Sequence, residues 1–340
     1  MNMQNWKQEY MNCAVKKPLP VLSFPGCQLL GYSVNDVVTN SRAQADCIIA
    51  IANRYDMAAA IGPMDLSVEA EAFGAQISFS NEEVPTVVGS VLSIDEPEKA
   101  DELTVPKVGD ARTGLYVEAI KLAKEQISNR PLLAGCIGPF SLAGRLMDMA
   151  DVMIACVEEP EMLETVLAKT TAFLTEYIKA MKEAGADGIV MAEPAAGLLS
   201  PALNEEFSVP YVKQIFDALK AEDFICCYHN CGPYVPRQLD DILDADADIY
   251  HFGDAIDLDE VKDRIPETVL FSGNVSPVTA FKTGSVDTMK AETLAVLEKC
   301  GNMRNFIPSS GCDIPPDASL ENADCFFETV AAYYGAKLHE

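Results

Sequence analysis

The chain has 340 residues, with 25 lysines and arginines against 52 aspartates and glutamates, so its formal net charge is −27 at pH 7. An acidic surface of this size repels nucleic-acid phosphates and anionic membrane faces, which excludes nucleic acid and membranes as binding partners. Hydrophobic residues make up 49% of the chain and charged residues 23%, which is typical of a folded globular protein and not of a disordered one.

The cysteines and the first residues indicate a cellular compartment. The 11 cysteines are spread along the chain and are not clustered as in a small secreted protein. The first residues, MNMQNWKQEYMN, contain no apolar core like that of a signal peptide. No uninterrupted apolar run approaches the roughly 18 residues of a membrane span. We therefore expect a cytoplasmic protein whose thiols are mostly free.

Short apolar runs bounded by polar turns recur along the chain. Such runs are typical of strands that are buried on both faces of a parallel sheet. Eight of them are found, at residues 21–24, 58–61, 131–136, 188–192, 224–228, 247–252, 268–272 and 303–307.

Longer stretches with helical spacing separate these runs. The clearest is 157–184, in which apolar residues recur every three or four positions from Leu163 to Met181. Gly185 follows directly and predicts the end of this helix, because glycine accepts the left-handed conformation found after helix ends. A chain that alternates strands and helices predicts parallel strands joined by right-handed crossovers.

Eight such units predict an α/β fold of the (β/α)8 (TIM) barrel type, formed by residues 1–340 as a single domain. The interval 62–130 between the second and third strands is too long for one crossover helix, so we expect an inserted loop or helical region there. An open, doubly wound sheet is the competing architecture. It fits less well, because no G-x-G-x-x-G follows the first run.

Candidate metal ligands follow two of the predicted strands, at the end of the barrel where active sites lie. His229 and Cys231 come at the end of the fifth run, and Cys312 follows the eighth. Two thiolates and one imidazole suit Zn²⁺ and leave its fourth position open, as in catalytic zinc sites. Such a site can keep a substrate sulfur nucleophilic, which suits transfer of an alkyl group. The alternative is structural: a core or capping histidine and small buried cysteines.

Four further residues are of interest. Asp65 and Glu193 are candidate catalytic residues, Asp65 to bind a cationic or N–H-bearing group and Glu193 to contact the substrate or to provide a fourth metal ligand. Their structural alternatives are a solvated loop aspartate and a helix-capping glutamate. Asn274, at the end of the seventh run, is a candidate contact to the cofactor. His251 lies inside an apolar run, which indicates a core histidine with satisfied hydrogen bonds.

Several segments spread over residues 20–335 resemble the uroporphyrinogen decarboxylase superfamily. The resemblance implies a (β/α)8 barrel, which agrees with the fold that the strand pattern predicts. The segments are GPFSLA at 138–143, EAGADG at 183–188, GLLSP at 197–201, PYVK at 210–213 and GNVSP at 273–277.

One branch of this superfamily contains the decarboxylases themselves. They hold the carboxylates of their substrate with an arginine-rich N-terminal segment, whereas residues 22–31, LSFPGCQLLG, contain no arginine. Asp65 does match the catalytic aspartate of the decarboxylases, judged by its nine-residue offset from Gly74. An acidic chain without the arginine clamp is poorly suited to a polycarboxylate substrate.

The other branch contains the zinc-dependent cobalamin methyltransferases of the methylcobamide:coenzyme M type. Their H-x-C…C pattern is matched by His229, Cys231 and Cys312, and the segments SVEAEAFG at 67–74 and GCDIPP at 311–316 also resemble theirs. This resemblance implies zinc as cofactor. It also implies a methyl donor in the form of methylcobalamin or of a corrinoid on a separate small protein that docks at the barrel mouth.

The acceptor implied by this branch is a small thiol such as coenzyme M, whose sulfonate needs a cation, and Arg145 is the candidate. The direction of transfer stays open, since the same site could demethylate a methylamine, a methyl halide or a methoxylated aromatic and methylate a Co(I) corrinoid. A decarboxylase-type lyase and a non-enzymatic barrel that binds a metal or a corrinoid also stay open as functions. The sequence leaves the oligomeric state open, a homodimer included.

Overall fold

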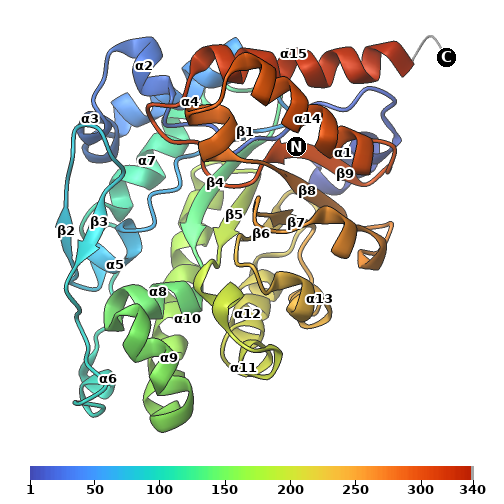
Figure 1. Ribbon diagram of the computed structural model, residues 1–340. Coiled ribbons are helices and arrows are strands. Elements are labelled where there is room, and N and C mark those ends of the chain that lie inside the picture. Colours follow the sequence, from blue (N-terminus) through green and yellow to red (C-terminus); the bar gives the residue numbers. More distant parts are fainter. Residues whose placement is uncertain (338–340) are drawn as a thin grey trace.

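Seven parallel strands curl around a common axis in the computed structural model, which describes residues 1–337, and helices surround them (Figure 1). Around the sheet the strands keep their chain order, unlike those of a doubly wound sheet, so the predicted α/β, TIM-barrel-like fold is confirmed. The strands are β1 (Ala60–Ile61), β4 (Leu132–Ile137), β5 (Gly188–Ala192), β6 (Ile225–Asn230), β7 (Ile249–Phe252), β8 (Leu270–Val275) and β9 (Phe306–Ser310).

The predicted strand at 21–24 is wrong, because residues 24 and 25 form a turn and helix α2 begins at Gly26. The chain instead fills the gap between β9 and β1 with an irregular segment, 18–21. The N–H of Leu19 donates to the carbonyl of Pro308 on β9 (2.8 Å), and the carbonyl of Pro18 accepts from Ala58 (2.9 Å). Proline has no N–H to donate to a ladder, so Pro18 and Pro20 prevent a regular strand here.

The helices follow the strands in the alternating order that the sequence predicts. The long helix begins at Pro160, three residues later than predicted, and ends at Glu183. Gly185 then adopts φ 110° and donates to the carbonyl of Lys182 (2.9 Å), which closes the helix end. Besides those in the interval 62–130, the helices are α1 (Met3–Asn12), α2 (Gly26–Leu30), α3 (Val34–Thr39), α4 (Ser41–Arg54), α8 (Pro139–Met147), α9 (Met149–Glu158), α10 (Pro160–Glu183), η1 (Ala195–Leu198), α11 (Pro201–Phe207), α12 (Val209–Leu219), α13 (Val235–Leu243), η2 (Leu258–Glu260), η3 (Lys262–Arg264), η4 (Pro277–Lys282), α14 (Val286–Cys300) and α15 (Leu320–Lys337).

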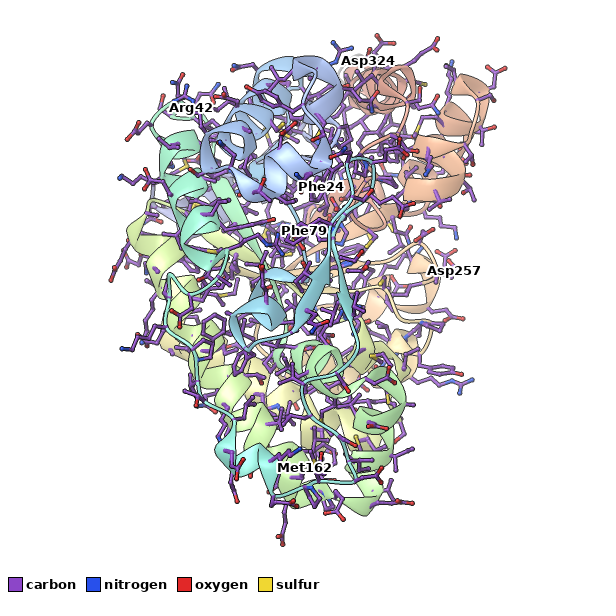
Figure 2. All side chains as sticks on the ribbon, turned by 90° about the vertical axis from the view of Figure 1, so that its left-hand side faces the viewer. Phe24, Arg42, Phe79, Met162, Asp257 and Asp324 are labelled. Atoms are coloured by element: carbon purple, nitrogen blue, oxygen red, sulfur yellow. The ribbon has the colours of Figure 1, made fainter. Side chains whose placement is uncertain are left out.

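The interval 62–130 contains more than a crossover helix. Its last helix, α7 (Thr113–Lys124), packs on α4 and connects back to β4. Before it come α5 (Val68–Ala72), an antiparallel hairpin of β2 (Gln76–Ser78) and β3 (Thr86–Val88), and α6 (Lys99–Glu102). The hairpin stands apart from the barrel sheet (Figure 1), and Figure 2 looks onto the face where it lies, with Phe79 labelled just after β2.

The strands separate two kinds of core. Alternate residues point into the barrel, where Cys227 on β6 packs with Ile249 on β7, or outward against the helices, where Cys226 and Tyr228 lie. Helix α1 covers the amino-terminal end of the barrel with apolar residues such as Met3. At the carboxyl end of the strands the inner positions become polar. Within residues 1–337, no helix combines the length and apolar character needed to cross a membrane.

Candidate metal centre

His229, Cys231 and Cys312 come together at the carboxyl end of the barrel. His229 is the next-to-last residue of β6, Cys231 follows that strand directly, and Cys312 comes two residues after β9. One ligand atom from each lies within 4.8 Å of the others, and the sulfur of Cys312 is 3.4 Å from Nε2 of His229. His229 is buried and both cysteines are half-buried. The three predicted metal ligands therefore form one cluster.

Close packing of two loops positions Cys231. A Cβ atom on Gly253, just after β7, would lie 2.3 Å from Cβ of Cys231, so only glycine fits there. On the other side, Gly232 donates to the side-chain oxygen of Asn230 (2.9 Å) and its Cα lies against Gly197. Tight packing of this kind keeps the thiol at the cavity.

The two thiols share a hydrogen bond. This bond lowers the pKa of Cys312 and raises that of Cys231, since one sulfur keeps its proton and donates it to the other. Cys312 is therefore the first of the pair to ionise. Metal binding requires both thiols as thiolates and the imidazole in its neutral form, so binding would release the remaining thiol protons.

The donor set fits zinc. Zinc takes thiolate and imidazole ligands at about 2.3 and 2.1 Å, which in a tetrahedron separates the ligand atoms by about 3.5–4 Å. The sulfur of Cys312 and Nε2 of His229 are 3.4 Å apart, and all three ligand atoms lie within 4.8 Å of one another, so shifts of about 1 Å or less would bring them to this spacing. Three protein ligands leave one position for an exchangeable group, as in catalytic zinc sites.

His251 belongs to this cluster as well, which the sequence did not reveal. Nδ1 of His251 lies 2.7 Å from Nδ1 of His229, and its Nε2 lies 2.9 Å from the hydroxyl of Ser309. Burial lowers the pKa of His251 well below its usual range. It is a buried and hydrogen-bonded histidine, as expected, but one of its partners is a candidate metal ligand. A sequence signal for this contact would have required the register of two neighbouring strands, in which His229 and His251 are paired.

A cavity of about 70 Å³ opens beside the three ligands, with a mainly apolar wall that includes Val190, Ala192 and Pro194. A second cavity, of about 250 Å³, shares Met64, Leu66 and Asp313 with the first. The exposed side chain of Arg145 lines this second cavity. The two cavities together can take a short sulfur compound with an anionic tail.

Asp313 is a second residue that sequence reasoning missed. Its side chain lines both cavities, and within residues 1–337 its Oδ1 has no hydrogen-bond partner. Burial raises the pKa of Asp313 well above its usual range. Its position directly after Cys312 is the only signal that the sequence offers.

Asp65 is fully occupied by contacts within the protein. Its carboxylate accepts from Nη1 of Arg112 (2.6 Å), the hydroxyl of Tyr116 (2.7 Å) and the hydroxyl of Ser67 (2.6 Å). The side chain is buried and does not line the metal cavity. In this structure Asp65 holds the start of the 62–130 interval against α7, and neither carboxylate oxygen is free for a substrate.

Glu193 caps a helix, which was the structural alternative. Its two carboxylate oxygens accept from the N–H groups of Phe140 (3.1 Å) and Ser141 (2.5 Å) in the first turn of α8. Burial raises the pKa of Glu193 to about 7. The next residue, Pro194, lines the metal cavity, so Glu193 anchors one wall of that cavity.

Asn274 supports the loop beneath Cys231. Its amide group donates to the carbonyls of Gly253 (3.0 Å) and Ile256 (2.6 Å). It lines a separate cavity together with Lys299. Its contact with a cofactor stays a prediction.

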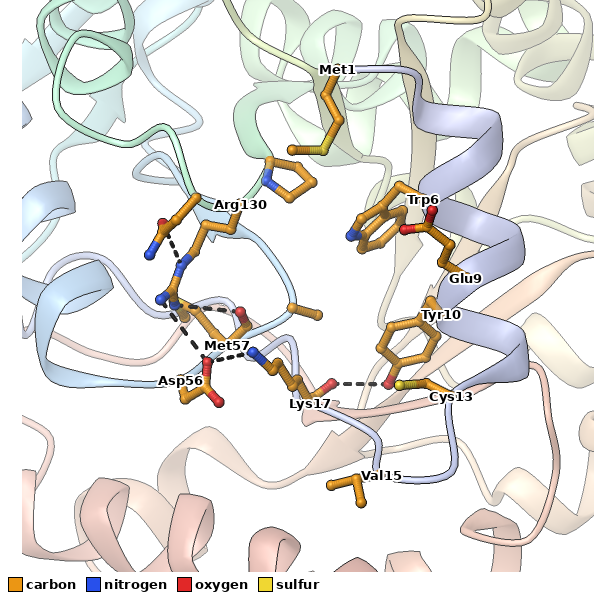
Figure 3. A pocket seen from close by; sticks show the side chains of 13 residues that line it. Met1, Trp6, Glu9, Tyr10, Cys13, Val15, Lys17, Asp56, Met57 and Arg130 are labelled. Atoms are coloured by element: carbon orange, nitrogen blue, oxygen red, sulfur yellow. Dashed lines mark hydrogen bonds and ion pairs between the residues drawn. The ribbon is translucent and has the colours of Figure 1, made fainter.

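A further cavity, of about 390 Å³, lies at the amino-terminal end of the barrel (Figure 3). Trp6 and Tyr10 of α1 face Lys17, Asp56 and Arg130 across it. Two of its cations are already paired, since Lys17 lies 2.8 Å and Arg130 4.0 Å from Asp56. The metal cluster lies at the other end of the strands, where TIM barrels hold their active sites.

The profile of the family described as uroporphyrinogen decarboxylase (URO-D) matches residues 23–333. The chain is 24% identical to a uroporphyrinogen decarboxylase of Hydrogenovibrio crunogenus, over 88% of this chain and 85% of that protein. It is 28% identical to the methylcobamide:CoM methyltransferase MtaA of Methanosarcina barkeri, over 90% of this chain and 88% of that protein. Among solved structures, a methyltransferase from Methanosarcina mazei is similar, with a TM-score of 0.85, 25% identity and 98% of both chains covered.

Proposed function

The chain belongs to the uroporphyrinogen decarboxylase family, and from this premise we propose that it is a zinc-dependent methyltransferase. It moves a methyl group from a methylcobamide, carried by a corrinoid protein, to a small thiol such as coenzyme M. Family membership alone does not distinguish methyl transfer from decarboxylation, because the chain is similar both to a uroporphyrinogen decarboxylase and to a methylcobamide:CoM methyltransferase.

The observation that carries the proposal is the cluster of His229, Cys231 and Cys312 at the barrel mouth. Decarboxylation of a tetrapyrrole needs no metal, whereas transfer to a thiol is helped by one. The residue that matches the decarboxylases' aspartate, Asp65, has both oxygens engaged by the protein. Both observations favour methyl transfer over decarboxylation.

Zinc, when bound, lowers the pKa of a substrate thiol and keeps its sulfur nucleophilic. The chain's own residues do the rest. Cys231 and Cys312 would hold the metal with His229 and, as thiolates, would make the site electron-rich. Val190, Ala192 and Pro194 form an apolar wall that would exclude water from a substrate sulfur held there.

The neighbouring cavity indicates the class of thiol. Arg145 is a cation for which no ion pair is found within residues 1–337, and its cavity continues from the metal cavity through Met64, Leu66 and Asp313. A thiol whose sulfur reaches the metal would extend its other end, for example a sulfonate or carboxylate, into the cavity that Arg145 lines.

Metal content is the first test. We expect about one zinc per chain in chelator-washed protein by elemental analysis, and none in the His229→Ala variant. With methylcobalamin as donor and coenzyme M as acceptor, Cys231→Ser and Cys312→Ser should lose zinc and methyl transfer together while the fold survives. A variant that has lost zinc but keeps full transfer would contradict the mechanism. Metal-free protein that converts a uroporphyrinogen would support the decarboxylase.

The role of Arg145 is tested by comparing two thiols. Arg145→Leu should raise the KM for 2-mercaptoethanesulfonate by about tenfold, which is the effect of one charge-assisted hydrogen bond at a partly exposed site. The KM for uncharged 2-mercaptoethanol should stay unchanged. Equal effects on both thiols would show that Arg145 does not recognise the anionic group.

A further inference from the structure

We infer that His251 is a positioning residue that sets the tautomer of His229, so that Nε2 of His229 is free to bind a metal. Ser309 sets the tautomer of His251 in turn. The three side chains come from three strands, β6, β7 and β9, and all lie in the polar layer at the carboxyl end of the barrel interior. Only the last step, metal binding, rests on the proposed function.

The fixed end of the hydrogen-bonded chain is the carbonyl of Leu19, in the irregular segment that closes the barrel. A carbonyl only accepts, and the hydroxyl of Ser309 lies 2.7 Å from it, so this hydroxyl donates. Its oxygen is then left as an acceptor toward Nε2 of His251, 2.9 Å away. His251 therefore carries its proton on Nε2.

The same reasoning continues to His229. A neutral imidazole holds one proton, so Nδ1 of His251 is an acceptor, and the atom that it faces at 2.7 Å, Nδ1 of His229, must donate. The backbone carbonyl of His251 lies 3.2 Å from the same Nδ1 and also only accepts. Two acceptors therefore place the proton of His229 on Nδ1.

The consequence is a bare Nε2 on His229, facing the sulfur of Cys312 at 3.4 Å. Without the imidazole of His251, only the longer contact to the backbone carbonyl of residue 251 (3.2 Å) favours the proton on Nδ1. Part of the population would then carry it on Nε2, where it would have to leave before a metal could bind. The segment that closes the barrel is thus connected to the imidazole of His229 through Ser309 and His251.

Nuclear magnetic resonance of the metal-free protein tests the tautomer directly. The chain has three histidines, and His339→Ala removes the signals of the one outside the described residues, so two imidazoles remain in the ¹H–¹⁵N long-range spectrum. We expect His229 protonated at Nδ1 and His251 at Nε2. His251→Leu should leave His229 as a mixture of tautomers, and His251→Asn, whose amide oxygen can replace the acceptor, should restore the Nδ1 proton. Wild-type protein with the proton on Nε2 of His229 would overturn the inference.

Zinc affinity, measured by competition with a chelator, tests the consequence. His251→Leu should weaken zinc binding by about 10–100-fold, and His251→Asn should recover most of the loss. Ser309→Ala should weaken it less, while Ser272→Ala, which removes another buried hydroxyl bonded to a strand carbonyl (3.0 Å), should have no effect. Thermal unfolding of the metal-free variants confirms that they fold.

The outcomes separate this inference from the proposed function. If wild-type protein shows the expected tautomers but binds no zinc, the proposed function fails and the hydrogen-bonded chain stands. If His251→Leu is folded and binds zinc as tightly as wild type, the positioning role is overturned. If the His251→Leu variant does not fold, the spectrum of wild-type protein still tests the inference, because a proton on Nε2 of His229 would overturn it.

Discussion

The ionisable side chains around the barrel mouth fall into two groups according to the contacts that their polar atoms make. Asp65 and Glu193 each accept hydrogen bonds with both oxygens and hold secondary structure in place. The two cysteines and His229 keep a ligand atom turned toward the cavity. Carboxylates at a strand end are therefore poor indicators of catalysis unless an oxygen is left without a partner.

We predict that Asp65→Asn acts on stability. Removing one member of a buried ion pair leaves Arg112 poorly compensated, so the free energy of unfolding in urea should fall by about 3 kcal/mol. Asp46→Asn is the matched control, because its pair with Arg42 lies at the surface and contributes less than about 1 kcal/mol. Zinc affinity should not change. A variant of normal stability without methyl transfer would instead make Asp65 catalytic.

The residue types made it possible to predict that His229, Cys231 and Cys312 form one cluster, because H-x-C after one strand and a cysteine after another place candidate soft ligands at the same end of a barrel. The role of His251 was not predictable from the sequence. It depends on the register of β6 and β7, which pairs His229 with His251 in adjacent strands. The ion pair between Asp65 and Arg112 was not predictable either, because a long inserted segment separates the two residues in the sequence.

At the scale of elements, the short helix α5 packs on the core with Val68 and Ala70 and also carries a buried acid that bonds to the barrel. Glu69 accepts from the N–H of Ile137 at the end of β4 (3.1 Å), and its other oxygen, Oε2, has no partner within residues 1–337. Burial raises the pKa of Glu69 from 4.5 to about 8. At neutral pH this side chain is therefore protonated in the folded protein.

This shift predicts a pH dependence of stability. Between pH 4.5 and 8 the unfolded chain has released the proton of Glu69 and the folded chain still holds it, so stability is greatest below this window and falls as pH rises through it. Glu69→Gln lacks this loss. Relative to wild type, the unfolding free energy of Glu69→Gln should rise from a difference below about 1 kcal/mol at pH 5 to about 3–5 kcal/mol at pH 8.

Urea titrations at pH 5, 6.5 and 8 measure the difference. Glu71→Gln is the control from the same helix, because Glu71 is ion-paired with Arg112 and its neutralisation should destabilise the protein at all three values. Parallel pH curves for wild type and Glu69→Gln would contradict the predicted protonation.

The loop after β7 positions the candidate ligand Cys231, because Gly253 packs directly against it. In Gly253→Ala the new Cβ would meet Cβ of Cys231 at 2.3 Å, so the thiol must move, and zinc binding should weaken by about tenfold or more. Gly335→Ala in α15 is the control, because a methyl group at this position would meet no atom within 4 Å, and it should raise stability slightly. Unchanged zinc affinity in Gly253→Ala would show that Cys231 does not depend on this contact.

The elements were predictable from the sequence where a run was uniformly apolar. The run 188–192 coincides with β5, whose residues are all buried. The prediction failed at the first position of the barrel. The apolar run 21–24 is not a strand, and the preceding residues occupy this position as an irregular segment, because Pro18 and Pro20 have no N–H groups to donate to a sheet. The hairpin of β2 and β3 was also not predicted, because its strands are three residues long and mostly exposed.

For the molecule as a whole, the candidate metal ligands connect parts of the chain that meet only in the closed barrel. His229 and Cys231 belong to β6 and its loop, and Cys312 follows β9, beside the segment that joins β9 to β1. The unfolded chain does not hold these atoms together. Metal binding should therefore favour the folded barrel, and this linkage gives a readout that does not depend on the identity of the substrate.

We predict that zinc raises the unfolding temperature of the whole chain. A free zinc concentration 100 times the Kd adds about 2.7 kcal/mol, which for a chain of this length corresponds to about 4 °C. The shift should grow with the logarithm of free zinc and disappear with a chelator and in Cys312→Ser, as followed by thermal unfolding. Because the other cysteines remain in that variant, an equal shift in Cys312→Ser would mean that zinc binds elsewhere and would contradict the proposed centre.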